Sequence, residues 1–88
     1  MNDRLENLAA SLGLPRELVS GSAVLSSFGD SCLFIENHKG LIEYGKERIK
    51  LHARPCKLEI TGVNLDIAYY TSDELKITGK ITEIRYYR

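Results

Sequence analysis

The sequence predicts a mainly β domain: an antiparallel meander of about seven or eight short strands, curled into a sandwich or a roll and preceded by an N-terminal amphipathic helix. Three observations predict this fold. From residue 22 onward apolar and polar residues alternate, as they do in strands with one buried and one exposed face. Residues typical of turns separate the alternating segments at short intervals. Helical spacing of apolar residues is confined to the start of the chain.

Composition bounds the class of protein. The 88 residues are enough for one small domain, and the 43% hydrophobic and 27% charged fractions are ordinary for a globular protein. Twelve Lys and Arg balance twelve Asp and Glu, which excludes the strong positive field of a general nucleic-acid binder. No apolar run approaches the roughly 20 residues that span a bilayer. We therefore expect a helix and linker over residues 1–20 and a β-domain over residues 21–88.

The predicted helix rests on the spacing of apolar residues near the N-terminus. One face of a helix would carry Leu5, Leu8, Ala9 and Leu12. Gly13 can end this helix because glycine adopts the left-handed conformation without steric cost. A helix of this length is marginal by itself in water, so we expect it to dock on the β-domain.

Neither the N-terminus nor the cysteines indicate export. Asp3 stands where an export signal carries positive charge. Cys32 and Cys56 lack the CxxC spacing of redox and zinc sites, and we expect free thiols in a reducing compartment rather than a disulfide. The sequence therefore predicts a cytoplasmic protein.

The alternation divides the second part of the chain into strands. It is clearest at residues 48–54, 57–61, 65–70 and 75–82. Turn residues occupy positions 29–30, 37–40, 45–46, 54–56, 62–64 and 71–73. Near the end, the apolar residues change from odd to even positions, at Ile84 and Tyr86. This change predicts a β-bulge or bend near Thr82 and Glu83, or a corner at which the last strand joins a second sheet.

A repeat of 16 or 17 residues underlies the pattern. Equivalent apolar positions are Leu33, Ile49, Leu65 and Ile81, and equivalent glycines are Gly29, Gly45, Gly62 and Gly79. A strand–turn–strand unit used about three and a half times explains this spacing. Such units form either a meander or a stacked β-roll, and the short turns favour the meander.

Histidines and motifs give no clear catalytic site. His38 lies in a predicted turn and His52 on an exposed strand face, without a second ligand at metal spacing. A metal site or a Cys–His nucleophile would require the fold to place His38 beside Cys32 or Glu36. The sequence also lacks a glycine-rich phosphate loop and a nucleophile elbow. We therefore expect no enzymatic activity, no metal and no cofactor.

Basic and aromatic residues indicate two candidate binding surfaces. The basic segment at residues 39–57 carries the candidates for binding an anionic lipid or, less expected, a nucleic acid: Arg48, Lys50, Arg54 and Lys57. The alternative is that these charges protect a strand edge from aggregation. The second candidate is an exposed patch suited to a protein partner, formed by Tyr69, Tyr70, Tyr86 and Tyr87.

Three short motifs carry a family resemblance. The string Glu36-Asn37-His38-Lys39-Gly40, with Leu-x-Ile-Thr-Gly units at residues 58–62 and 75–79, resembles the YabP/YqfC family of sporulation proteins. The Leu14-Pro15 step is similar to the YqfC branch. The resemblance covers roughly residues 14–86, and it departs at residues 53–57, where a glycine is expected.

The resemblance implies a role in endospore formation in a Firmicute. Members act in the mother cell, are needed for the spore envelope (coat or cortex), and have no assigned catalytic activity. It implies a small protein-binding module beside a membrane-protein partner of the same pathway, at the forespore outer membrane surface. Self-association through unpaired strand edges is a further expectation.

The segment at residues 36–40 has two interpretations. Asn37 and Gly40 tolerate positive φ and would shape a tight hairpin, while His38 and Lys39 would project from its tip. A structural turn needs the first pair, and a docking site would use the second. His38 and Lys39 therefore join Tyr86 and Tyr87 as candidates for partner binding.

Overall fold

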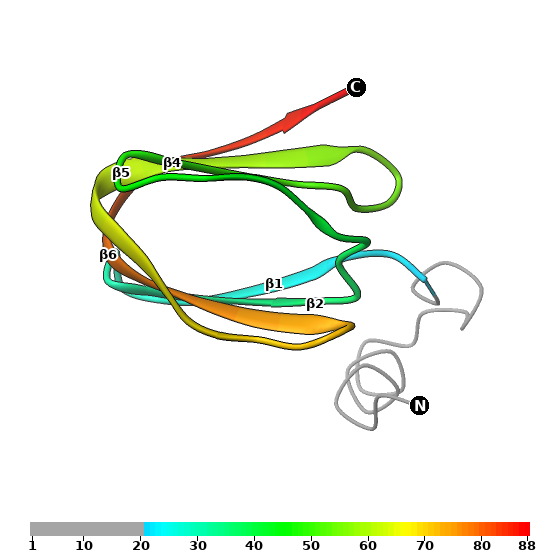
Figure 1. Ribbon diagram of the computed structural model, residues 1–88, viewed down its shortest axis with the longest axis horizontal. Coiled ribbons are helices and arrows are strands. Elements are labelled where there is room, and N and C mark those ends of the chain that lie inside the picture. The colour runs from blue at the N-terminus through cyan, green and yellow to red at the C-terminus, as the bar shows by residue number, and fades with distance from the viewer. Residues whose placement is uncertain (1–20) are drawn as a thin grey trace.

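The computed structural model describes residues 21–88 (Figure 1). The helix predicted at the N-terminus lies outside these residues. The described chain forms six strands: β1 (Val24–Phe28), β2 (Cys32–Glu36), β3 (Leu41–Tyr44), β4 (Arg48–Leu51), β5 (Lys57–Tyr70) and β6 (Glu74–Tyr87). Residues 21–88 contain no helix, and so none long and apolar enough to cross a membrane. The prediction of a mainly β, antiparallel domain is confirmed.

All six strands belong to one sheet, in the order β1-β2-β6-β5-β4-β3. The two long strands, β5 and β6, bend in the middle, so the sheet folds over on itself into two layers (Figure 1). The first layer contains β1, β2, the first half of β6 and the second half of β5. The second layer contains β3, β4 and the other halves of the long strands.

The sheet differs from the predicted meander in strand number and in order. Consecutive strands pair with each other except β2 and β3, because β2 pairs instead with β6, with Leu33 opposite Ile77. Six strands replace the seven or eight expected, since residues 62–64 lie within β5 and do not form a turn. Residues 75–81 and 84–87 likewise belong to a single strand, β6.

Two glycines make the bend of the long strands possible. A Cβ atom on Gly62 would lie 2.0 Å from the carbonyl oxygen of Lys80, and one on Gly79 would lie 2.4 Å from that of Asn64. Gly79 also has φ +116°, which side-chain-bearing residues rarely adopt. The two backbones therefore cross at a distance that only glycine allows.

The predicted change of parity in the last strand is confirmed as a β-bulge. Thr61 lies opposite Glu83 and Gly62 lies opposite Ile81, which leaves Thr82 as the extra residue. The Thr82 hydroxyl donates a hydrogen bond to the Thr61 carbonyl oxygen at 3.1 Å. Beyond the bulge, even-numbered residues of β6 share the face of the core residues, as Ile84 opposite Ile60 shows.

The sequence repeat corresponds to four structural units, each with a glycine at its centre. In the first two units the glycines, Gly29 and Gly45, lie in the turns of the hairpins β1–β2 and β3–β4. In the last two, Gly62 and Gly79 lie at the bends of β5 and β6. Equivalent hydrogen bonds dock the hairpins on the bends: the Ile81 amide donates to Asp30 O at 2.7 Å, and the Leu65 amide to Lys46 O at 2.8 Å. The domain thus has an approximate two-fold symmetry.

The core lies between the layers and draws on both. Its nine buried residues are Leu33, Ile35, Ile49, Leu51, Leu58, Ile60, Leu65, Leu75 and Ile77. All are Leu or Ile, and burying each contributes roughly 1.5–3 kcal/mol before the entropy cost of folding. Each half of the domain supplies matched pairs, Leu33 opposite Ile77 in the first layer and Ile49 opposite Ile60 in the second.

We expect Gly79→Ala to lower the free energy of unfolding by about 3 kcal/mol or more, because a methyl group must displace the backbone at Asn64. Gly40→Ala is the matched control, because Gly40 has a similar φ of +121° but nothing within 4 Å of the added atom. Urea unfolding followed by circular dichroism measures both changes. Equal losses in the two variants would contradict the close-crossing explanation.

Candidate functional site

The segment at residues 37–40 is a crossover between the layers, not a hairpin. It leaves β2 in the first layer and enters β3 at the opposite end of the sheet (Figure 1). The Asn37 amide donates to Asp73 O at 2.6 Å, in the turn between β5 and β6. The Lys39 amide donates to His52 O at 2.7 Å, just after β4. The crossover therefore ties both layers together at one end of the sandwich.

His38 is buried in this crossover, with 2% of its surface exposed. Its Nδ1 accepts a hydrogen bond from the Gly40 amide at 3.1 Å. Nε2 therefore carries the hydrogen and donates to Thr71 O at 2.8 Å. The ring packs on Tyr70, with 4.8 Å between ring centroids. The expectation that His38 projects from a hairpin tip is wrong, because these contacts require it to point inward.

The other residues of the signature string divide between interior and surface. Asn37, at φ 65°, donates from its side chain to Ser22 O at 3.1 Å, and Glu36 is buried opposite Glu74. Lys39 alone is exposed. Positive φ at Asn37 and Gly40 agrees with the sequence prediction, although it shapes a crossover. Lys39 is thus the residue of this string that can meet a partner directly.

The basic residues predicted to bind anions lie in a network with carboxylates. Glu43, Lys50, Glu59 and Arg85 stand opposite one another in a row across the second layer. Arg48 contacts Glu43 at 3.2 Å and Glu59 at 3.7 Å, and Arg85 contacts Glu59 as well. The two carboxylates therefore offset much of the charge of Arg48, Lys50 and Arg85, which weakens the attraction of this face for an anionic surface.

Arg54 and Lys57 lie apart from that row. Arg54 is in the loop after β4, where its carbonyl oxygen accepts the Ala23 amide at 3.0 Å. Lys57 stands opposite Tyr87, and its Nζ lies 5.8 Å from the centre of that ring. Lys50 Nζ lies 5.7 Å from the same ring, so Tyr87 is a packing surface for cations.

The four tyrosines do not share one patch. Tyr69 and Tyr70 end β5 in the first layer, whereas Tyr86 and Tyr87 end β6 in the second. Tyr86 stands opposite Leu58, on the face of the sheet that carries the core, yet 61% of its surface is exposed. Tyr87 points to the other face, towards Lys50 and Lys57.

An aromatic cluster on the outer face of the first layer was missed by the sequence analysis. Phe28 packs edge-on against Phe34 at 5.6 Å between centroids, and Phe34 lies 6.4 Å from Tyr69. Lys76 Nζ is 5.3 Å above the Phe34 ring. The signal was available, because Phe34 stands between the core residues Leu33 and Ile35 and must face outward. We call Phe28, Phe34 and Tyr69 the aromatic patch.

The approximate two-fold symmetry fails at the sides of the sandwich. On one side the Tyr44 hydroxyl donates to Asp66 at 2.5 Å and joins β3 to β5. This hydrogen bond raises the pKa of Tyr44 and lowers the pKa of Asp66. The repeat places Phe28 at the position of Tyr44, and Phe28 cannot make this bond.

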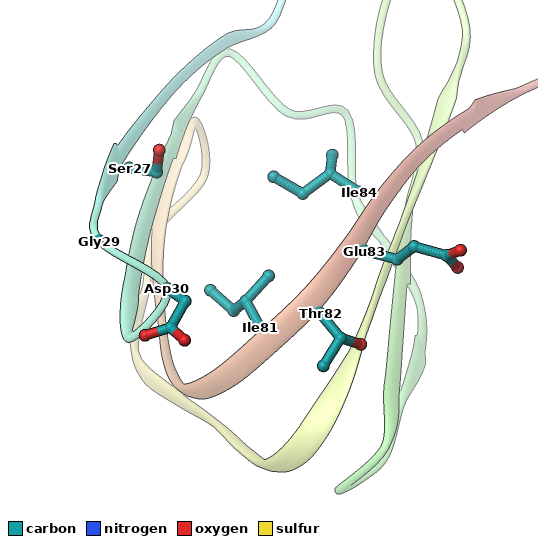
Figure 2. Close-up of a pocket in the computed structure, with 7 residues that line it drawn as sticks. All are labelled: Ser27, Gly29, Asp30, Ile81, Thr82, Glu83 and Ile84. Atoms are coloured by element: carbon teal, nitrogen blue, oxygen red, sulfur yellow. The ribbon is translucent and has the colours of Figure 1, made fainter.

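The other side is open (Figure 2). A cleft of about 250 Å³ lies between the β1–β2 turn and the second half of β6. Ile81 and Ile84 point into it, while Glu83 points away. Lys80 and Asp30 form an exposed ion pair at 3.7 Å near its end. Among residues 21–88, no three His, Cys, Asp or Glu side chains gather as a metal site.

Comparison with known proteins gives one family and one curated relative. Residues 23–88 match the YabP family model. The chain is 25% identical over 79 residues to a protein described as "Uncharacterized protein YqfC" from Bacillus subtilis (strain 168), an alignment that covers 90% of this chain and 85% of the relative. No solved structure matches the chain significantly.

We expect His38→Ala to lower the free energy of unfolding by about 2 kcal/mol, because it leaves the Gly40 amide and the Thr71 carbonyl without their partner. Lys39→Ala should change it by less than about 0.5 kcal/mol, since the side chain is exposed. Urea unfolding of the two variants tests the structural role of the crossover. A His38 variant as stable as wild type would overturn that role.

The Tyr44–Asp66 bond predicts a pH-dependent contribution to stability. The pKa of Asp66 is lower in the folded protein than its ordinary value of 3.8. The stabilisation is therefore present above pH 3.8 and is lost as pH falls through the pKa of the folded state. The pKa of Tyr44 is higher in the folded protein than its ordinary value of 10.0. The stabilisation is therefore present below pH 10.0 and is lost as pH rises through the pKa of the folded state. Wild type should therefore exceed Tyr44→Phe in stability between these limits, and the difference should vanish outside them. A difference independent of pH in urea unfolding would count against the bond.

Proposed function

The chain belongs to the YabP family, and on that premise we propose that it is a non-enzymatic interaction protein of endospore formation. It acts in the mother-cell cytoplasm, at the surface of the forespore outer membrane, in development of the spore coat or cortex. Its partner is a membrane protein of the same pathway. The resemblance of residues 36–40 to the YabP/YqfC signature and the Bacillus subtilis relative support this setting.

The observation that carries the proposal is the aromatic patch. The outer face of a two-layered sheet usually meets water and carries polar residues. Here Phe28 is 63% exposed and lies in contact with Phe34, which in turn neighbours Tyr69. Exposed aromatic residues of this kind are enriched at protein interfaces, where their large apolar area is buried.

The charge beside the patch indicates the chemistry of the partner. Lys76 lies over the Phe34 ring and supplies a cation at the centre of an apolar surface. A partner segment with apolar side chains and a carboxylate would satisfy both features. Such a segment lies outside the bilayer, in the cytoplasmic part of the membrane protein.

Binding to anionic lipid or nucleic acid through Arg48, Lys50, Arg54 and Lys57 is the alternative proposal. The ion pairs of Arg48 and Lys50 with Glu43 and Glu59 make it the weaker one. Retention of the wild-type chain on anionic vesicles at low salt, lost at physiological salt, would favour the alternative over the aromatic patch.

Spore yield tests the proposal. In a sporulating host that lacks its own copy, we expect the double variant Phe28→Ser/Tyr69→Ser to give at least tenfold fewer heat-resistant spores than the wild-type chain. The physical reason is that both substitutions remove apolar area from the patch while leaving the core residues in place. Photocrosslinking from position 28 should join the chain to a membrane protein.

Val63→Ser is the matched control, because Val63 is an exposed apolar residue at the bend of β5, outside the patch. It should leave the spore yield unchanged. Immunoblots and urea unfolding of the purified variants confirm equal amount and stability. A wild-type yield from a stable double variant would refute the role of the patch.

A further inference from the structure

The open side of the sandwich contains a strand edge with half of its backbone pairing unused. β2 pairs with β6 only from Glu74 to Thr78, whereas β5 pairs with β6 along its whole length. Among residues 21–88, residues 82–87 of β6 therefore have a neighbouring strand on one side only. The Ile81 amide, which donates to Asp30 O, is the last contact to the β1–β2 turn. A free edge of this kind is a template for another strand.

Apolar residues line the same edge. Ile84 is 37% exposed and points into the cleft beside Ile81 (Figure 2). Tyr86 follows on the same face of the strand and is more exposed still. On the equivalent side of the domain, residues 65–70 of β5 likewise pair only with β6 among residues 21–88, but there the Tyr44–Asp66 bond joins β3 to β5. An added strand would bury these residues together with the edge.

We propose that the occupant is a second copy of this chain, whose residues 82–86 pair antiparallel with the same residues about a two-fold axis at Ile84. The inference goes beyond the proposed function and does not depend on it. The two sheets join edge to edge through their second layers, and each Ile84 faces Ile84 of the second copy. Both clefts then lie beside the shared axis.

Charge selects this register. A two-fold axis perpendicular to the sheet places residues of the same face opposite each other. One residue must therefore lie opposite its own copy, with the axis between the two. With the axis at Ile84, Glu83 faces Arg85 of the second copy, and this pair occurs twice. With the axis at Glu83 or at Arg85, two like charges face each other, and with the axis at Tyr86 no opposite charges meet.

Arg85 can serve two carboxylates at once. Within one chain its guanidinium already contacts Glu59, whose side chain is almost fully buried. The planar guanidinium has five N–H donors, so donors remain for Glu83 of the second copy. Glu83 itself is exposed and points away from the cleft, towards the face where Arg85 lies (Figure 2). The row Glu43–Lys50–Glu59–Arg85 would thus continue across the dimer.

Sedimentation velocity of the full chain, at concentrations from about 1 to about 200 µM, tests the proposal. This range spans the dissociation constants expected of weak protein interfaces. We expect wild type to sediment as a dimer at the upper end of this range. Glu83→Arg should raise the dimer dissociation constant at least tenfold, because it places two like charges opposite each other on either side of the axis. Ile42→Arg is the matched control, since Ile42 is similarly exposed, at 41%, on β3, an edge strand of the sheet that takes no part in the proposed pairing.

Disulfide trapping tests the register. In a background with Cys32→Ser and Cys56→Ser, Ile84→Cys should form an intermolecular disulfide under mild oxidation, because facing residues have Cα atoms about 4.5–5.5 Å apart. Tyr86→Cys should not, since the two positions would lie roughly 13 Å apart along the strands.

Three results would overturn the proposal. They are a monomer at every concentration, a dimer weakened by Ile42→Arg but not by Glu83→Arg, and trapping at Tyr86→Cys in place of Ile84→Cys. A monomer that still requires Phe28 and Tyr69 for spore formation would reject the dimer and retain the proposed function.

Discussion

The crossing of β5 and β6 at Gly62 and Gly79 lets one sheet supply both layers of the core. Because Gly62 and Gly79 have no Cβ atoms, the two backbones approach closely enough to bend together. The two halves of each long strand then belong to different layers. The hairpins dock on the bends through the amides of Ile81 and Leu65. The nine core residues face one another only because the sheet folds at this point. The constraint is steric, and it acts through backbone atoms.

The approximate two-fold symmetry that follows from this crossing makes the differences between the two halves informative. Both halves repeat the hairpin, the glycine and the matched core pairs. They differ where Tyr44 bonds Asp66 on one side and where a cleft remains on the other. They also differ in that one outer face carries a network of ion pairs and the other carries the aromatic patch. The two halves are therefore similar in their core residues and differ in their surface residues.

Local pattern predicted much of this structure, and nonlocal pairing limited the rest. Alternation located the strands, and the shift to Ile84 and Tyr86 located the bulge, because both follow from the two-residue period of a strand. A glycine permits a bend within a strand as readily as a turn between strands. Residues 62–64 were therefore predicted as a turn, whereas they lie at the bend of β5. The inward position of His38 depends on Thr71, 33 residues away, and no local signal reports such a contact.

The pairing of β2 with β6 has a consequence for synthesis on the ribosome. Leu33 and Ile35 gain their second neighbouring strand only from residues 74–78, which are synthesised after β3, β4 and β5. The apolar face of the β1–β2 hairpin therefore stays exposed to solvent while the ribosome synthesises β3, β4 and β5. Contacts so distant along the chain slow closure of the domain and expose the nascent chain to aggregation. A premature stop before β6 would release a polypeptide that cannot complete its first layer.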